Sequence, residues 1–495
     1  MKVPLRVLQI GPIAVVLAVT LHRAFELDRF LIPKELVLHA TALVAGVAAF
    51  GALRRMVWTR VDQLLAVYLA VSAVSVVFAT NRWVGWRAFA VSASAILIFW
   101  VARVLREAGL APALLRGLAL AIVVAAITSL LQTYGVELEL FSVNRAPGGT
   151  LGNRNFIGHT AAFGLPVLLF VLLTAQRVTL AAAGVALTMM ALVLTRSRAA
   201  WLAAAAVFVI FIAGSLVARA WKRFAVVLIA AVIGVAAALL IPNALHWRSD
   251  NPYLQSMKSV TNYEKGSGAG RLIQYQRSLF MAAMHPLLGV GPGNWPVRYP
   301  HYAARNDPSL DESEPRMTFN PWPSSDWIAI LSERGFAAAL ALAIAAVMIA
   351  LTALRSDDRL QATALIATLA AAAIAGAFDA VLLLAEPTLL VFATLGALFV
   401  PAEPRTRGRL APLLVLIVAF LGVIRSASQI AAMELFTRGS RSSLEQAATL
   451  DPGNFRVQLR LARIGKRAER CEHARAAAAL FPTSAAAASA ARGCE

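Results

Sequence analysis

Apolar segments recur along most of this chain, and their length is the feature that most restricts its fold. A helix needs about 20 apolar residues to cross the hydrocarbon core of a bilayer. Candidate spans lie near residues 7–22, 36–53, 61–79, 86–102, 113–132, 156–174, 178–194, 199–217, 224–241, 328–354, 361–383, 386–401 and 410–424. These segments predict an all-α polytopic membrane protein with about 12–13 transmembrane helices.

The composition leads to the same class of protein. The 495 residues are 59% hydrophobic and 15% charged, and the mean hydropathy is +0.70, which excludes an ordinary soluble protein. Short basic loops near anionic headgroups explain the net charge of +20. No basic stretch carries a module that reads nucleic acid. We therefore expect membrane lipid, and no nucleic acid, among the partners.

The lysines and arginines of the short loops predict the orientation. The first apolar segment resembles a signal peptide but lacks a small-residue cleavage site, so we expect a retained helix. If its N-terminus lies inside, the inside segments carry more lysine and arginine than the outside short loops. Residues 242–327 and the C-terminal tail then lie outside.

The chain divides into four predicted parts: N-terminal transmembrane helices (1–241), a large polar loop (242–327), C-terminal transmembrane helices (328–424) and a tail (425–495). We expect the loop to be the active-site region. Its first half holds the basic residues Arg248, Lys258, Lys265, Arg271, Arg277, Arg298 and Arg305, with Asp250 and Glu264. Its second half is mostly acidic. The two halves could bind different substrate groups, or they could pair with each other.

Two local patterns stand out within the loop. Residues 271–284 have helical periodicity, with Arg271, Gln274 and Ser278 on one face and apolar residues opposite. This pattern predicts a helix on the membrane surface, with Arg271 turned towards a polar cavity. The sequence GVGPGNW (289–295) is a glycine turn. Because no strand precedes it and no lysine–serine/threonine pair ends it, a structural turn is favoured over a phosphate-binding loop.

Several arginines fall on the predicted outside, against the general trend. Arg145 and Arg154 flank a glycine-rich segment, and Arg196 and Arg198 lie where two spans meet. One such arginine alone is most simply interfacial. Together, on the face that carries the loop, they indicate a site for an anionic lipid headgroup or a diphosphate, because arginine combines a fixed charge with a bidentate fork.

Motifs for metal binding or nucleophilic catalysis are absent from the sequence. The histidines predicted to lie outside are scattered singly, namely His22, His159, His246, His285 and His301. We therefore expect no metal and no cofactor. Asp379 falls inside a predicted span, where an acid is costly, and is a site candidate for that reason.

The tail has a different composition, with alanine-rich helical stretches broken at Asp451-Pro452 and Phe481-Pro482. Their 30-residue spacing is close to the period of tetratricopeptide-type helical hairpins. A protein partner could bind there. The cysteines at 471 and 494 could pair if the tail lies in an oxidising compartment.

An ordered set of segments resembles the O-antigen ligase/O-antigen polymerase (Wzy-C-type) family of membrane glycosyltransferases. The segments are GTLGNRNFIGHTAAFGLPVLL, TRSRAAWLA, GRLIQYQRSLFMAAMHPLLGVGPGNWPVRYP and SSDWIAILSERGF. The resemblance implies a GT-C-like fold in the bacterial inner membrane, with loop and tail periplasmic. It also implies a metal-independent, inverting enzyme. Such an enzyme moves a glycan from an undecaprenyl-diphosphate donor to a lipid A-core (ligase), another lipid-linked glycan (polymerase) or a protein.

The resemblance also assigns roles to residues. The family's serine–arginine motif falls on Ser197-Arg198 and its loop-helix arginine on Arg271, which would hold the diphosphate leaving group. Further substrate-binding candidates are Arg196, Arg154, Arg277, Arg298, His301 and Asn155.

One position departs from the family pattern. The family histidine proposed as general base falls on Ser324, and an unassisted serine is a poor base at neutral pH. Asp326, His301 or His285 could take the proton, and we favour Asp326 because it stays at the same membrane edge. A transporter or flippase for lipid-linked sugars is the main alternative, although no repeated halves are visible.

Overall fold

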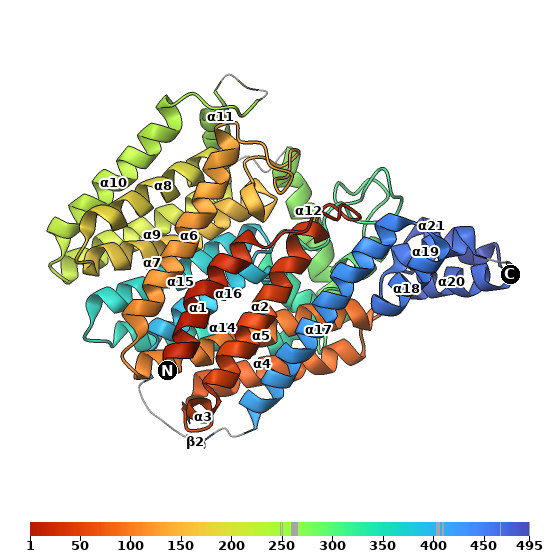
Figure 1. Cartoon of the computed structure of the whole chain (residues 1–495), viewed down its shortest axis with the longest axis horizontal. Helices are drawn as coiled ribbons and strands as arrows, with labels where there is room; N and C mark the ends of the chain where they lie inside the picture. The colour runs from red at the N-terminus through yellow and green to blue at the C-terminus, as the bar shows by residue number, and fades with distance from the viewer. Residues whose placement is uncertain are drawn as a thin grey trace.

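The computed structural model describes residues 1–247, 249, 251–258, 266–401, 406–407, 410–465 and 467–494. Long helices pack side by side into a bundle, and a smaller helical tail projects from it (Figure 1). The described strands are β1 (Val57–Trp58) and β2 (Thr406–Arg407), which pair antiparallel with Val57 opposite Arg407. The predicted all-α polytopic fold is confirmed.

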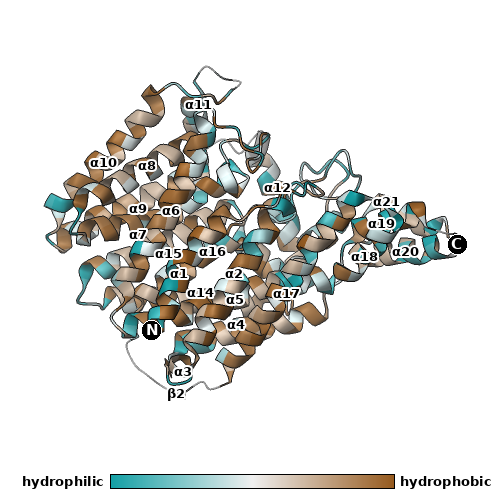
Figure 2. Cartoon of the chain, viewed as in Figure 1, coloured by the Kyte–Doolittle hydropathy of each residue, from teal (hydrophilic) through white to brown (hydrophobic). Residues whose placement is uncertain are grey.

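Among the described residues, eleven helices are long and apolar enough to cross a membrane. They are α2 (Asp28–Ala48), α4 (Arg60–Val77), α5 (Arg82–Glu107), α6 (Ala111–Thr133), α7 (Arg154–Thr174), α8 (Val178–Thr195), α9 (Arg198–Val217), α10 (Trp221–Leu240), α14 (Asp326–Leu354), α15 (Arg359–Phe378) and α17 (Ala411–Arg438). Their residues are mostly hydrophobic, whereas hydrophilic residues gather at helix ends, in loops and on the tail (Figure 2).

Two shorter helices complete the bundle at positions where spans were expected. Helix α1 (Lys2–Leu17) has 16 residues and α16 (Ala385–Leu398) has 14. Both are shorter than the shortest of the eleven, which has 18 residues, and than the roughly 17 residues that are the least a crossing needs. Helix α1 ends before the predicted limit because the backbone is extended at Ala18. The carbonyl oxygen of Ala18 accepts a hydrogen bond from Lys34 Nζ (2.6 Å). Eleven full-length spans and two short helices therefore account for the thirteen predicted segments.

One pair of opposite charges inside the bundle shows how pairing reduces the cost of burying them. The side chains of Asp62 and Arg103 are both fully buried and form an ion pair. Asp62 also closes a capping box with Thr59 at the start of α4. This pair helps to hold α4 against α5.

The glycine turn is structural, as its sequence favoured. Gly293 N–H and Trp295 N–H donate to the Glu333 carboxylate at 2.9 and 3.1 Å. Gly291 N–H donates to the carbonyl oxygen of Glu333 (2.9 Å). Helix α14 is interrupted next to this contact at Gly335 (φ 79°), where a Cβ would lie 2.1 Å from the Leu287 carbonyl oxygen. The turn therefore braces a break in a transmembrane helix, and these amides are not free to bind an anion.

The predicted surface helix is present as α12 (Gly266–Met284). Its polar face turns inward, since Gln274 is 4% exposed and Ser278 is fully buried. Its apolar face is open, with Leu272 and Phe280 about half exposed at 50% and 55%. This orientation suits a helix whose apolar side meets lipid.

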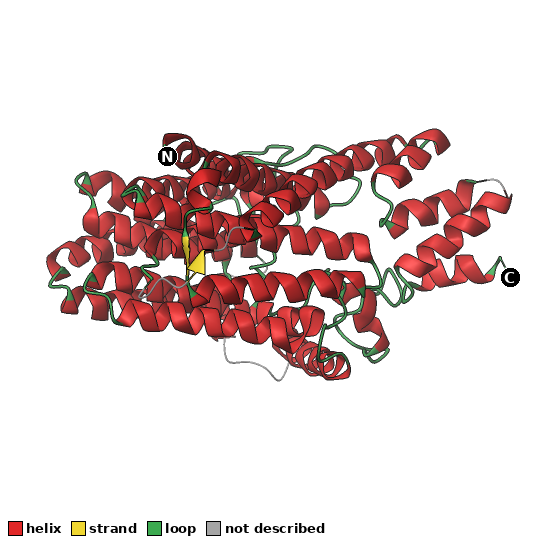
Figure 3. Cartoon of the chain, turned by 90° about the horizontal axis from the view of Figure 1, so that it is seen from below, coloured by secondary structure: helices red, strands yellow, loops and turns green. Residues whose placement is uncertain are grey.

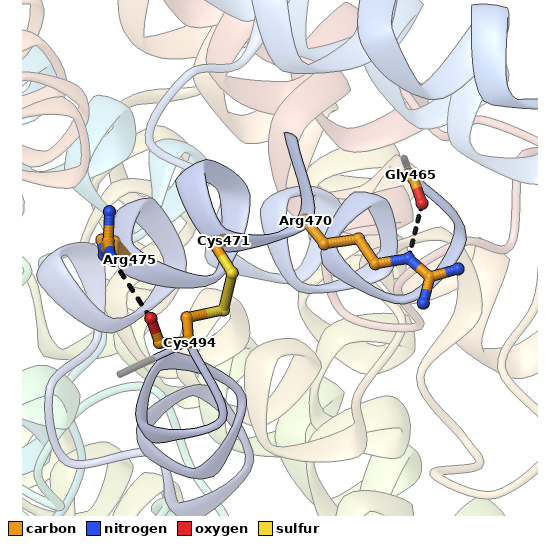
Figure 4. The surroundings of a disulfide bond; sticks show 5 residues. All are labelled: Gly465, Arg470, Cys471, Arg475 and Cys494. Atoms are coloured by element: carbon orange, nitrogen blue, oxygen red, sulfur yellow. Dashed lines mark hydrogen bonds between the residues drawn. A yellow bond between two sulfur atoms is a disulfide. The ribbon is translucent and has the colours of Figure 1, made fainter. Parts of the chain in front are cut away.

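The tail continues from α17 as α18 (Arg441–Leu450), α19 (Phe455–Ile464), α20 (Arg467–Leu480) and α21 (Ala485–Arg492). Each of these short helices packs on the next one in the sequence. They lie at the end of the molecule that carries the C-terminus (Figure 3). The sulfurs of Cys471 and Cys494 are bonded, which joins α20 to the chain after α21 (Figure 4). Helix α17 is continuous through residue 425, so the predicted domain limit falls within a helix.

Hydrogen bonds dock the tail onto the membrane helices. Asn81 Nδ2 donates to the Gly453 carbonyl oxygen (2.9 Å), and Trp83 Nε1 donates to Asp451 Oδ1 (2.6 Å). In Figure 1, α12 and the tail both lie away from the end of the bundle that carries the N-terminus and β2. Loop and tail thus share one end of the molecule.

Within the described residues, no ion pair joins the basic half of the loop to its acidic half. Arg248, Asp250, Glu264 and Lys265 lie outside the described residues. Within the described part of the loop, the ion pair formed by the acidic half joins Glu314 to Arg456 of the tail (3.1 Å). The acidic half therefore contributes to tail docking.

Candidate active site

Two of the predicted arginines lie on the same aromatic ring. Arg154 begins α7, and Arg196 occupies the left-handed turn (φ 56°) that follows α8. Their guanidinium carbons lie 5.2 and 4.6 Å from the ring centroid of Trp247. Arg196 Nε also donates to Ser256 Oγ (2.9 Å). The loop thus fixes two cations at the start of α7 and the end of α8, where they can attract an anionic group.

The Ser197-Arg198 turn lies directly against α7. Ser197 is the N-cap of α9, and Arg198 is the first residue of that helix. At Gly158 of α7, an added Cβ would lie 2.9 Å from the Ser197 Cβ. A glycine is therefore needed for this close approach. It brings the turn next to His159, the following residue of α7.

His159 contacts Asp379 across the bundle. His159 Nε2 lies 3.1 Å from Asp379 Oδ2; the His159 side chain is 1% exposed and that of Asp379 is 15% exposed. Asp379 follows the last residue of α15. Burial alone would raise the pKa of Asp379, but its hydrogen bond with His159 and the charges of His159 and Arg271 outweigh this, so the pKa lies below its usual value. Asp379 is thus a partly accessible, charged carboxylate.

Helix α12 positions Arg271 and the segment before α14. The Tyr275 hydroxyl lies 2.7 Å from the Ser324 carbonyl oxygen and 2.9 Å from that of Ala377. Ser324 N–H donates to Gln274 Oε1 (2.6 Å). These bonds tie α12 to the end of α15, one turn from Arg271, whose charge acts on Asp379. The charge of Arg271 thus contributes to the lowered pKa of Asp379, and its position in the site stays a prediction.

The carboxylate of Asp326, the general base expected from the sequence, is held by backbone amides. Asp326 is fully buried. Val381 N–H and Leu382 N–H donate to its carboxylate at 2.9–3.0 Å, and its own N–H donates to the Asp379 carbonyl oxygen (3.2 Å). These bonds clamp the α15–α16 connection to the start of α14. A carboxylate occupied in this way fixes the backbone that carries Asp379.

The remaining predicted residues are spread more widely. Asn155 is half-buried in the first turn of α7, close to Arg154. Arg277 and Arg298 are half-buried, Arg277 in α12 and Arg298 at the end of α13 (Trp295–Arg298). His301 is exposed, and the loss of part of its hydration together with the charges of Arg298 and Arg316 lowers its pKa. Within the described part of the chain, no hydrogen bond or ion pair joins any of these four residues to Asp379.

A cavity of about 470 Å³ lies beside this site. It is bounded by the α1–α2 connection, the start of α5, the end of the loop and the tail. The ten residues predicted for catalysis or substrate binding do not line it, whereas Arg145, Trp322 and Leu384 do. In the described part of the chain, no group of three or more His, Cys, Asp or Glu side chains is arranged to hold a metal ion.

Comparison with known proteins gives one finding. Residues 183–343 match the family model described as O-antigen ligase. No curated protein matches the chain. The matched segment runs from α8 into α14 and includes Arg196, Arg198, Arg271 and Ser324, whereas His159 and Asp379 lie outside it.

Proposed function

We propose that this chain, a membrane protein of the O-antigen ligase/polymerase-type family, transfers a glycan from an undecaprenyl-diphosphate donor at the periplasmic face of the bacterial inner membrane. The His159–Asp379 pair carries the proposal (3.1 Å). It lies beside the Ser197-Arg198 turn and within the field of Arg271. A base and a set of fixed cations are the two parts that such a transfer requires.

The arginines act on the leaving group. In the transfer, the bond between the anomeric carbon and the diphosphate oxygen breaks, and the diphosphate keeps the electron pair. Negative charge therefore grows on that oxygen in the transition state. Preorganised cations at this position stabilise the transition state more than the ground state. Arg198 and Arg271 take this role, and Arg154 and Arg196 hold the outer part of the diphosphate.

Asp379 acts on the acceptor. The acceptor hydroxyl oxygen forms the new bond to the anomeric carbon, and Asp379 accepts the proton. His159 Nε2 and the Ala380 N–H hold the two carboxylate oxygens at 3.1 and 3.0 Å and so fix the orientation of the carboxylate, whose remaining lone pairs can accept from the reacting hydroxyl. This role replaces that of the family histidine, whose position is occupied by Ser324. A single displacement of this kind inverts the anomeric centre and needs no metal.

The acceptor can be a lipid A-core, another lipid-linked glycan or a protein. Deleting the gene and separating surface glycans on a gel distinguishes these outcomes. Unextended cores with accumulated lipid-linked chains indicate a ligase, whereas single-repeat products indicate a polymerase. Unchanged surface glycans with loss of protein glycosylation indicate protein transfer.

Purified full-length protein in vesicles with the lipid-linked donor tests the reaction directly. Movement of the donor between leaflets without formation of a glycan–acceptor product would indicate a flippase and overturn the proposal.

A further inference from the structure

The cavity of about 470 Å³ is built jointly by the membrane helices and the tail. Its volume falls within the roughly 300–1,000 Å³ typical of small-molecule sites. The tail contributes Phe455, Arg456 and Phe481 to the wall. The tail is therefore part of a binding cavity as well as an appendage.

Aromatic rings form much of this wall. Phe455 and Phe481 pack with ring centroids 4.7 Å apart on the tail side. Trp83, Phe319 and Trp322 line other parts of the wall, and Phe319 is 60% exposed. Flat aromatic faces are suited to the C–H faces of sugar rings, which are apolar although their edges carry hydroxyls.

Charged groups are interleaved with the rings. Arg87 pairs with Glu35 (2.8 Å) and Asp28 (3.3 Å), and all three line the cavity. An acyl chain in this cavity would cover these groups without hydrogen-bonding them, which is costly. Sugar hydroxyls can both donate to the carboxylates and accept from the guanidinium. The lining therefore favours a saccharide over a lipid chain.

The cavity adjoins the proposed reaction centre. Leu384 of its wall lies five residues after Asp379, in the connection to α16. Trp322 of its wall packs on Phe156 of α7 (centroids 6.2 Å apart), one turn before His159. Arg154, Arg196, Arg198 and Arg271 are outside the wall. Arg145 is the one outside arginine of the sequence analysis that lines the wall, and Asp379 itself does not line it. A saccharide bound here therefore approaches Asp379 from a side that carries none of the four arginines assigned to the diphosphate.

We infer that this cavity binds the saccharide part of the acceptor and that the tail forms its specificity-determining wall. The assignment of the bound saccharide to the acceptor rests on the proposed glycan transfer. Saccharide binding in the cavity can be tested without that activity. It also restricts the acceptor to a molecule that presents sugar next to the reacting hydroxyl.

Two variants with matched controls test the inference. Phe319→Ala removes an exposed ring of the loop wall, and Phe280→Ala removes a similarly exposed ring of α12 that is outside the wall. Arg456→Ala alters the tail wall, and Arg463→Ala alters an exposed tail arginine away from it. The exposure of these side chains, and the small worth of the exposed Glu314–Arg456 ion pair that Arg456→Ala removes, keep the folding cost small.

The first readout is binding to the purified full-length protein in detergent. The probe is oligosaccharide released by mild acid from the envelope of the host bacterium, followed by tryptophan fluorescence. We expect saturable binding, weakened about fivefold by each wall variant and unchanged in both controls. Absence of saturable binding, or equal weakening in the controls, would overturn the inference.

The second readout is transfer at varied acceptor and donor concentrations. We expect the wall variants to raise KM for the acceptor and to leave KM for the donor unchanged. A rise in the donor KM alone would instead assign the cavity to the donor glycan and contradict the inference. Saccharide binding without any transfer by the unaltered protein would contradict the proposed function and leave the cavity assignment standing.

Discussion

His159 Nε2 lies 3.1 Å from Asp379 Oδ2, although 220 positions separate the two residues in sequence. One belongs to α7 and the other follows α15, so the contact depends on the packing of two distant transmembrane helices. The pair places a charged carboxylate beside a turn that carries an arginine.

Replacing His159 by glutamine should slow transfer. Glutamine keeps a hydrogen-bonding group but holds the carboxylate less well, because its amide is neutral and differently shaped. We expect kcat to fall about tenfold to a hundredfold, with KM for the donor nearly unchanged. Steady-state rates in vesicles measure both constants. An unchanged kcat with a raised donor KM would assign His159 to donor binding instead.

Arg271→Ala should remove a cation that stabilises the leaving diphosphate. We expect a loss of about a hundredfold in kcat, and partial recovery in Arg271→Lys, which keeps the charge but loses the bidentate fork. Arg305→Ala is the matched control, because Arg305 is an exposed arginine of the same loop. Equal activity of Arg271→Ala and this control would exclude the proposed role.

Trp247→Leu should weaken donor binding. The ring of Trp247 is in contact with the guanidinium groups of Arg154 and Arg196, at 5.2 and 4.6 Å. Without it the two arginines lose a surface that orders them, at a cost of about 0.5–1 kcal/mol each. We expect KM for the donor to rise about fivefold, and Trp221→Leu, at an exposed position, to have no effect. A selective fall in kcat would contradict this assignment.

Asp326→Asn should affect stability more than chemistry. The carboxylate accepts hydrogen bonds from Val381 N–H and Leu382 N–H inside the protein, and the amide can accept with only one of its two groups. We expect the free energy of unfolding to fall by about 1–3 kcal/mol. Thermal unfolding in detergent measures this loss. The transfer rate per folded molecule should stay within about threefold of the unaltered protein. A thousandfold loss of rate at unchanged stability would restore Asp326 as the base.

Much of the bundle could be predicted from the sequence because the bilayer imposes a length on every crossing. All thirteen predicted segments contain a helix, and the surface helix was predicted from its periodicity. The two short helices differ from the expected length for local reasons, such as the extended backbone at Ala18. The positions of these helices depend on the local sequence, so they can be predicted from hydrophobic patterns.

The site was less predictable because its parts meet only through tertiary packing. Asp379 was marked by its cost within an apolar span, but nothing in the sequence linked it to His159, which counted as one of several scattered histidines. Asp326 was preferred as base for its position at the membrane edge, and the two backbone amides that occupy it come from residues 55 and 56 positions away. The cavity walls likewise come from distant parts of the chain.

The most direct test of the account is the transfer rate of Asp379→Asn. Asparagine keeps the size of the side chain and a contact with His159 but cannot accept the acceptor proton. The measurement uses purified full-length protein in vesicles with lipid-linked donor and a glycan acceptor, with Asp357→Asn, at an exposed position before α15, as control. We predict a loss of about a hundredfold or more in kcat at unchanged donor KM and thermal stability, and full activity in the control. Transfer by Asp379→Asn at the rate of the control would contradict the central claim.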